Sequence, residues 1–598
     1  MIDISFALSH NDTVIVQKKY MKKTPPKKTI VSAKSTDTKG VKIKSPKEIT
    51  IVVGYAPIES KKGVALLSQN RQFQYFNAKT YIYPMVPAYA ASNLNKHEYN
   101  VYWMDGIAEE KTYDKWVDEL SATSPDYLMV ETKSPIVKTH WKQIKDLKKK
   151  LPHLKLIWVG DHISYLPMEI FENSPVDYAI TGGDYDFVVV NLLNHIYKGE
   201  VLEGGVYWRE KNHDMNVPKN ERREKKLASG EIIYNSGPVS LKHKLDDLPF
   251  VDRDLTKWEL YAYDNGNYKY TPGTYMYSGR DCWWNRCTFC VWDHTINPIG
   301  SYRSFSPERL FAEVKHVVDN YGIKEIFDDA GTMFIGPKLK KFCNLLIESG
   351  YNKKVVYGCN MRFNALNQEY YNLMGKANFR FILYGMESGN QKTLDKLDKG
   401  TKEADAINGP KMASKAGLDP HITIMLGYPW ETYEEARRTI DIAKYAFKKG
   451  YYETMQATIV IPYPGTPLYK ECKEKDLLLT DDYDDFDMRR PVMKIPFEHE
   501  KLMELEQDLY SVFMTPQYIT RKILEIRSFH DFKYLFYMGW KLIGHLLDFD
   551  PNQTKVNYFS FAFIKNASSK LFGHFFRPKT SVDREKDAIK LEESAMNL

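Results

Sequence analysis

Cysteine is absent from the first 281 residues of this 598-residue chain, and the whole sequence contains only six. Such scarcity fits a protein of a reducing compartment. Long hydrophobic runs are also missing: no segment approaches twenty uncharged apolar residues, and the start MIDISFALSH has no basic region followed by an apolar stretch. The sequence therefore predicts neither a transmembrane segment nor a signal peptide, and we expect a cytoplasmic location.

Acidic residues are nearly missing between Gln17 and Lys47, where eleven lysines stand beside one aspartate. This surplus of ten exceeds the formal charge of +7, so the remainder of the chain is slightly acidic. The stretch is also rich in Pro, Ser and Thr, which predicts a flexible basic segment over residues 1–48. A short basic tail attracts polyanions weakly and without specificity, so we expect no specific nucleic-acid partner.

Half of the cysteines stand within nine residues, in the run SGRDCWWNRCTFC that contains Cys282, Cys287 and Cys290. Thiolates gathered in one loop bind soft metals together. Three ligands leave one metal position open to a small molecule, whereas a closed structural zinc site needs four. A zinc site or a redox loop remains an alternative. The nearest candidates for a fourth ligand are His294, Cys343 and Cys359.

Apolar strand patterns alternate with helical patterns after the cysteines. The strand IKEIFDDAGT ends with Asp328 and Asp329, KVVYGCNMR ends with Arg362, and FRFILYGMESG delivers Glu387 and Ser388. The segments HITIMLGYPWET and TMQATIVIPYPGTPLY follow with helical patterns between them. This alternation predicts parallel βαβ units. Polar residues at the strand ends stand where α/β barrels place their sites.

The aromatic residue before the last cysteine, together with these strand-end motifs in this order, resembles the radical S-adenosylmethionine (SAM) enzymes from about Tyr275 to Leu478. The resemblance implies a partial (β/α)6 TIM-like barrel and a [4Fe-4S] cluster on the three cysteines, with SAM on the fourth iron. It also implies reductive SAM cleavage, oxygen sensitivity and a low-potential electron donor such as ferredoxin or flavodoxin. The chain departs from the family in its C-x4-C-x2-C spacing, since C-x3-C-x2-C is usual.

The same resemblance assigns the candidate SAM contacts. Phe289 would lie against the adenine through its backbone, and Asp328 or Asp329 would sit near the methionine end. The carboxylate or ribose of SAM would be approached by Arg362, Glu387 and Ser388. No residue is assigned a catalytic role from the sequence.

The region before the cysteines repeats a strand, a loop and a helix five times from Ile49, which is the pattern of a doubly wound parallel sheet. Small residues line two strand ends, in the GDH and TGGD loops. Directly before a radical SAM core, such a module resembles the cobalamin-binding domain of the cobalamin-dependent radical SAM class. The residues at the matching positions are Gly160, Asp161, His162, Thr181, Gly182 and Gly183.

The D-x-H-x-x-G string that supplies a cobalt-binding histidine in other cobalamin proteins does not occur. We therefore expect His162 to be a loop residue facing solvent or the corrin edge. Within this class the implied reaction is C-methylation, ring closure or rearrangement at an unactivated carbon. The implied substrate is a small or lipid-like molecule.

The predicted layout is a flexible segment over 1–48, a cobalamin-binding-like α/β domain over 49–200 and a linker with short strands over 201–268. The radical SAM barrel follows over 269–480, and a C-terminal helical region covers 481–598. The aromatic stretch FKYLFYMGWKLIGHLL fits a helix that packs on the barrel, or one that binds an apolar substrate or a membrane surface. We expect the last twenty residues to be a loose tail.

Two other functions stay open. A non-catalytic cobalamin or metal sensor would explain the unusual cysteine spacing. A radical SAM methylthiotransferase would need three further cluster cysteines in its N-terminal domain, and residues 1–281 contain none.

Overall fold

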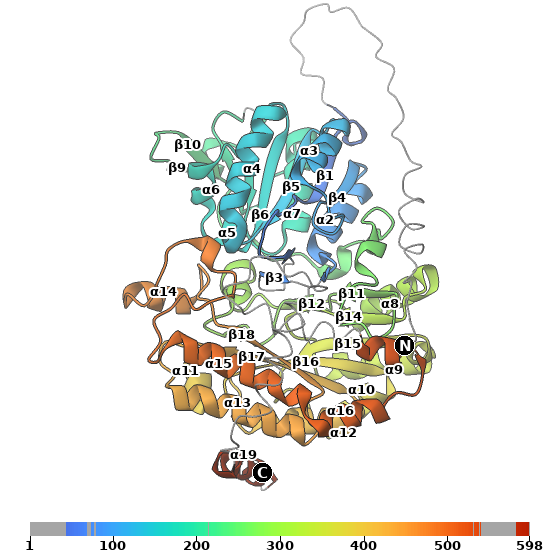
Figure 1. The fold of residues 1–598 in the computed structure, drawn as a ribbon. Helices are drawn as coiled ribbons and strands as arrows, with labels where there is room; N and C mark the ends of the chain where they lie inside the picture. Colours follow the sequence, from blue (N-terminus) through green and yellow to red (C-terminus); the bar gives the residue numbers. More distant parts are fainter. Residues whose placement is uncertain are drawn as a thin grey trace, which may run out of the picture.

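The computed structural model describes residues 44–67, 73–76, 79–212, 214–529, 531–536, 539 and 582–596. Most of the predicted flexible segment lies outside these residues; its end, Pro46–Glu48, forms the short helix η1. Two α/β modules lie one above the other, with the N-terminal module at the top of Figure 1. No helix in the described ranges is long and apolar enough to cross a membrane.

The N-terminal sheet, as far as it is described, has eight strands in the order β4-β1-β5-β6-β7-β8-β10-β9. The first five are parallel, and the last three are joined by antiparallel pairing. Their bounds are β1 Thr50–Tyr55, β4 Asn100–Asp105, β5 Tyr127–Thr132, β6 Lys155–Gly160, β7 Tyr178–Ile180, β8 Val206–Arg209, β9 Arg223–Lys226 and β10 Ile232–Asn235.

The parallel part confirms the predicted doubly wound sheet. Every residue of β1 and β5 is buried, as expected for strands covered on both faces. In chain order the parallel strands are arranged 2-1-3-4-5, so the order reverses between β1 and β5, where such sheets bind ligands. The covering helices include α2 Met85–Lys96, α3 Tyr113–Ala122, α4 Val137–Lys150 and α7 Tyr185–Lys198.

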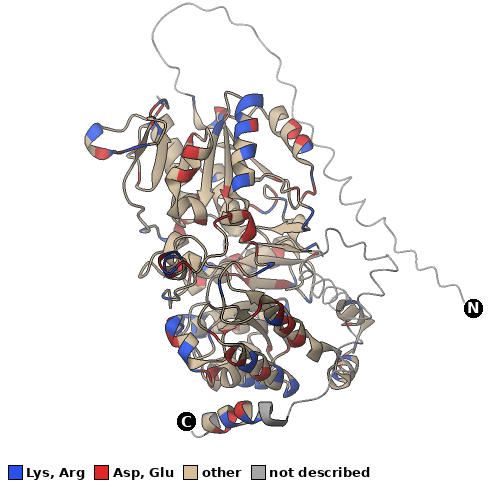
Figure 2. Cartoon of the chain, turned by 60° about the vertical axis from the view of Figure 1, so that its left-hand side comes forward, with Lys and Arg blue, Asp and Glu red and all other residues tan. Residues whose placement is uncertain are grey.

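The second module is the predicted partial barrel. Its six described strands are each parallel to the next, in sequence order. They are β11 Gly273–Met276, β14 Glu325–Asp328, β15 Val356–Met361, β16 Phe379–Glu387, β17 Asp419–Leu426 and β18 Thr454–Ile459. The connecting helices include α8 Pro307–Tyr321, α9 Pro337–Glu348, α10 Gln368–Lys376, α12 Asp405–Lys415 and α13 Tyr433–Lys448. Lys, Arg, Asp and Glu are mixed over these outer helices (Figure 2).

The C-terminal region is helical, with α14 Pro467–Glu474, α15 His499–Tyr510, α16 Pro516–Leu524 and α19 Val582–Met596. The prediction of a loose tail is wrong, because α19 packs on the barrel helices. Ala588 and Leu591 are buried, and Glu592 accepts hydrogen bonds from Lys411 and Tyr445, both at 2.6 Å. The aromatic stretch predicted as a helix from Phe532 is helical over 532–536, and most of its remainder lies outside the described residues.

Candidate functional site

The three clustered cysteines lie between β12, Gly279–Arg280, and the short π-helix η6, Trp292–Ile296. None of them forms a disulfide, and all three line one cavity of about 1060 Å³. Burial raises the pKa of Cys282 to about 11 and that of Cys287 to about 12, and it also raises the pKa of Cys290. Without metal these side chains are therefore thiols, and binding a metal would displace their protons.

The donor set fits a three-thiolate cluster. The other three cysteines are buried elsewhere, and neither they nor His294 line this cavity. Among the described residues, no group of three His, Cys, Asp or Glu side chains is arranged around a single ion. Two cations, Arg362 and Lys399, line the cavity and lower the pKa of Cys287 against the effect of burial. Their charge would stabilise thiolates at this position.

Glu387 and Lys399 form the central ion pair of this wall. The Lys399 Nζ donates to Glu387 Oε1 at 2.7 Å, and both side chains are about nine-tenths buried. Glu387 has φ +60°, a rare conformation for a residue other than glycine, and such strain is concentrated at functional sites. Arg362 donates to the backbone oxygen of Lys399, so the three charged side chains form one group beside the cysteines.

The predicted SAM contacts separate into two sets. Phe289, Arg362 and Glu387 line the cavity together with the cysteines. The other three predicted contacts do not line it: Asp328, Asp329 and Ser388. Asp328 accepts hydrogen bonds from the Ser278 backbone at 2.9 Å and from the Tyr357 hydroxyl at 3.1 Å, and Ser388 donates to Glu431 at 2.6 Å. These side chains hold neighbouring loops in place.

Three charged residues of the cavity wall near the cysteines were not found from the sequence. Lys399 lies in a loop without a recognisable motif, so nothing in the sequence marked it. Asp281 and Asp293 stand beside the cysteine run and line the cavity. Burial raises the pKa of Asp281 to about 7 and that of Asp293 to about 6. Their position next to cysteines was the signal that could have found them.

The extra residue of the C-x4-C spacing belongs to a segment anchored by Trp284. The indole nitrogen donates to the Asp398 backbone oxygen at 2.6 Å, and the ring lies 4.4 Å from the Arg362 guanidinium. A Cβ on Gly400 would stand 2.1 Å from this ring. The long first gap therefore ties the cysteine loop to the Asp398–Gly400 turn.

The residues predicted to contact cobalamin pack closely against other parts of the protein. A Cβ on Gly182 would stand 2.5 Å from Val239, and one on Gly183 would stand 2.6 Å from Ile296. Gly160 ends β6, and Thr181 donates to Gly205 O at 3.0 Å. None of the six predicted residues lines the cavity. The two loops are therefore packed against neighbouring side chains and lie outside the cavity that holds the cysteines.

The expectation that His162 is a loop residue facing solvent or a corrin is wrong. Asp161–Tyr165 form the short helix α5, and His162 is 1% exposed. Its Nδ1 pairs with Ser134 Oγ at 2.9 Å and its Nε2 with Glu169 Oε2 at 2.6 Å. Both ring nitrogens are engaged, because α5 packs on β6 and turns the side chain inward.

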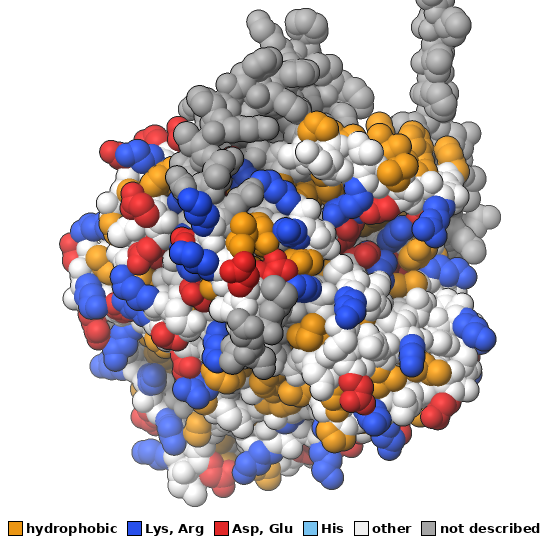
Figure 3. All heavy atoms as spheres, turned by 90° about the horizontal axis from the view of Figure 1, so that it is seen from below, with side chains coloured by type: hydrophobic (Ala, Val, Ile, Leu, Met, Phe, Trp, Pro, Cys, Tyr) orange, Lys and Arg blue, Asp and Glu red, His pale blue; other side chains and the backbone are white. Residues whose placement is uncertain are grey.

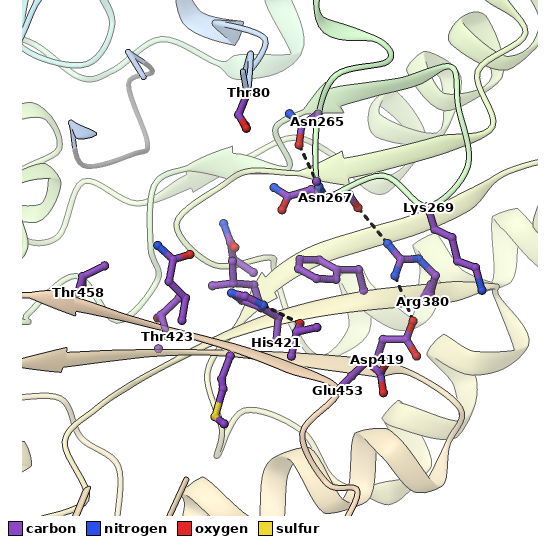
Figure 4. A pocket seen from close by; sticks show the side chains of 18 of the residues that line it. Thr80, Asn265, Asn267, Lys269, Arg380, Asp419, His421, Thr423, Glu453 and Thr458 are labelled. Atoms are coloured by element: carbon purple, nitrogen blue, oxygen red, sulfur yellow. Dashed lines mark hydrogen bonds and ion pairs between the residues drawn. The ribbon is translucent and has the colours of Figure 1, made fainter. Parts of the chain in front are cut away.

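The cavity continues from the cysteines along the inside of the barrel. Side chains alternate across a strand, so every second residue of β16 and β17 points into it. Its interior is mixed, with Phe381 and Leu383 beside His421, Thr423 and Thr458 (Figure 4). The hairpin between β2, Val64–Leu66, and β3, Gln74–Phe76, contributes residues from the N-terminal module.

The chain is similar to several known proteins. Residues 276–443 match the model of the radical SAM superfamily. The chain is 25% identical over 450 residues to an uncharacterized methyltransferase of Pyrococcus horikoshii, covering 75% of this chain and 91% of the relative. It is 22% identical over 421 residues to the anaerobic magnesium-protoporphyrin IX monomethyl ester cyclase of Cereibacter sphaeroides, covering 69% of this chain and 63% of that enzyme.

Two solved structures share the arrangement of both modules. The cobalamin-dependent SAM radical enzyme OxsB, with aqua-cobalamin and SAM bound, superimposes with a TM-score of 0.59 at 15% identity, covering 92% of this chain and 84% of OxsB. The radical SAM methyltransferase TsrM of Kitasatospora setae, with cobalamin and a [4Fe-4S] cluster bound, gives 0.54 at 14% identity, covering 92% and 99%. At such identity the likeness concerns the fold. The chain is a radical SAM enzyme with the fold of the cobalamin-dependent radical SAM class.

Proposed function

We propose that this enzyme holds a [4Fe-4S] cluster on Cys282, Cys287 and Cys290 and cleaves SAM reductively. The proposal rests on the composition of one cavity wall. It carries three thiols and no fourth one, together with the charged side chains of Arg362, Glu387 and Lys399. When bound, the cluster would supply one electron at low potential and one open iron position. The electron would come from an external donor such as ferredoxin or flavodoxin.

The described side chains suit the methionine end of SAM, which carries both an amino and a carboxylate group. Glu387 offers an anion and Arg362 and Lys399 offer cations within one buried group. Phe289 and Trp292 add apolar surface and exclude water from this end of the cavity. Binding and orienting SAM here is the contribution of the protein.

The electron balance is simple. One electron enters the sulfonium, the C5'–S bond breaks, and methionine and a 5'-deoxyadenosyl radical result. The radical removes a hydrogen atom from an unactivated carbon of the substrate, giving 5'-deoxyadenosine and a substrate radical. From the substrate radical, C-methylation would need a methyl donor in addition, ring closure would need an acceptor for the one remaining electron, and rearrangement could end by regaining a hydrogen atom. The relatives named as methyltransferase and cyclase support the first two.

Cobalamin is part of the proposal through the shared fold of OxsB and TsrM. The two loops predicted to contact it pack against Val239, Ile296 and the hydrogen-bond partners of His162, and they lie outside the cavity that holds the cysteines. Retention of corrin absorbance after desalting would support its use, and its loss would leave a radical SAM enzyme without cobalamin.

The test is anaerobic reconstitution with iron, sulfide and hydroxocobalamin, followed by dithionite and SAM. We expect about four irons per chain, as three thiolates plus SAM complete one cubane, and release of 5'-deoxyadenosine. Cys287→Ala should remove both, whereas Cys343→Ala, a buried cysteine away from the cavity, should retain both. Absence of SAM cleavage by a loaded wild-type protein would instead favour the sensor.

A further inference from the structure

Exposed apolar side chains are concentrated in one short part of the described chain. Six large apolar residues between 519 and 536 are exposed, among them Phe529 at 81%, Leu524 at 76% and Phe536 at 69%. We call these residues the apolar rim. It consists of Ile519, Ile523, Leu524, Phe529, Phe532 and Phe536. Contiguous exposed apolar surface marks sites of binding.

Four of the six rim residues line the cavity that holds the cluster cysteines. Ile519, Ile523, Phe532 and Phe536 line that cavity at the end where β16, β17 and β18 begin. With the exception of Gly331, every exposed residue among the described residues of the cavity wall lies between 519 and 539. The rim is therefore an opening of the barrel interior.

Ion pairs hold the rim segment over the starts of the barrel strands. Lys522 of α16 pairs with Glu453, directly before β18, and the next segment is fixed by Lys269 and Asp531 at 3.0 Å. Tyr518 packs against Phe447 and Phe513 with ring centroids 5.0 and 5.4 Å apart. The apolar side chains are thus presented to solvent by an anchored scaffold. Seen from below, charged side chains of both signs lie among hydrophobic ones (Figure 3).

Polar groups lie deeper inside. His421, Thr423 and Thr458 stand along the strands between the rim and the cysteines, while Arg380, Asp419 and Glu453 lie near the strand starts (Figure 4). Arg380 is neutralised by Glu325 at 2.6 Å and Asp419 at 3.1 Å, so it presents no unpaired charge. The interior offers hydrogen-bonding groups. The mouth also carries charged side chains, but they are paired with one another: Lys269 with Asp531, Arg380 with Asp419, and Lys522 with Glu453 and Glu525. The large apolar side chains exposed beside these pairs are those of the rim.

From this polarity we infer that the substrate is an amphiphile with a hydrocarbon part of lipid size, which enters head first through the apolar rim. Its polar end would reach the interior near His421 and Thr423, and its hydrocarbon part would remain against Phe532 and Phe536. A cavity of about 1060 Å³ is large enough for such a ligand. The inference rests on the proposed function, since it places the reacting carbon at the polar end, toward the cysteines.

The experiment measures binding of 11-(dansylamino)undecanoic acid to the full-length reconstituted protein by fluorescence. Phe532→Asp and Phe536→Asp should each weaken binding about tenfold, the loss of one well-buried aromatic contact. Val201→Asp, an 80% exposed apolar residue of the other module, should leave it unchanged. Thr423→Trp, which fills the interior, should abolish binding while the rim is intact.

If the rim variants bind the probe as tightly as wild type, the inference is overturned. Full binding by Thr423→Trp would also overturn it, because the probe would then adsorb only to the surface. Uncoupled 5'-deoxyadenosine formation by wild type and by Val201→Asp is measured in parallel and should be the same in both. Its absence from both proteins would count against the proposed function instead. The probe is presented either free in solution or in phosphatidylcholine–phosphatidylglycerol vesicles, which shows whether the protein takes the amphiphile from solution or from a membrane. Uptake that depends on the rim supports the inference in either case.

Discussion

Arg280, two residues before the first clustered cysteine, donates hydrogen bonds to both carboxylate oxygens of Asp186 in the N-terminal module, one of them at 2.9 Å. It also donates to Asp184 at 3.1 Å and to the Gly183 backbone at 2.9 Å. Arg280 and Asp186 are at most 3% exposed. The TGGD loop is therefore fastened directly to the segment that carries the cysteines.

Removing one partner of this buried pair should be costly. Asp186→Asn would leave Arg280 with a buried and partly uncompensated charge, and we expect a loss of about 3–5 kcal/mol in unfolding free energy. The matched control is Asp319→Asn, whose exposed pair with Lys315 should matter by less than about 1 kcal/mol. Anaerobic thermal melts compare the two. If Asp186→Asn and Asp319→Asn melt at the same temperature, the Arg280–Asp186 pair does not stabilise the fold.

The same network predicts a dependence on pH through His243. Burial lowers its pKa, but the carboxylates of Asp184 and Glu203, both at 2.9 Å, outweigh burial and raise it to about 9 from 6.5. The added stability is fully present below pH 6.5 and is lost as the pH rises through 9. We expect a loss on the order of 1 kcal/mol, reduced by solvent screening. Melts at pH 6 and 9.5 test it, and His243→Gln should not show this change.

The contact between Gly400 and Trp284 can be tested with two alanine variants. Gly400→Ala places a methyl group against the indole and should displace the cysteine loop, with a severalfold loss of bound iron. Gly322→Ala has the same φ of +64° with nothing within 4 Å, so it reports backbone strain alone. Iron content after reconstitution is the measurement. If both variants bind iron alike, Trp284 does not position the loop.

Glu387→Gln removes the negative charge from the pair with Lys399 while keeping its shape. We expect the KM for SAM to rise about tenfold, the value of one charge-assisted hydrogen bond, with iron content unchanged. Glu403→Gln is the control, since Glu403 pairs with Arg438 away from the cavity wall. Unchanged SAM kinetics would make Glu387 a structural turn residue.

The strands could be predicted because apolar runs with polar ends are a local property of the sequence. The same pattern located Arg362 and Glu387 at the strand ends, where the structure brings them beside the cysteines. It could not give the direction of each side chain: Asp328 and Ser388 stand at the same ends but turn to Tyr357 and Glu431. Lys399 was missed because its place depends on how a loop folds back.

The cavity also has a direction. Its cysteine end is lined by buried residues such as Cys287 and Phe289, with Gly331 beside Asp281 as the exposed exception among the described residues, while large exposed side chains surround the rim. A first ligand bound at the cysteine end would be held in place by a second ligand that enters later through the rim. Steady-state kinetics should then be sequential and ordered, with SAM as the leading reactant and the amphiphile second, and release should reverse that order.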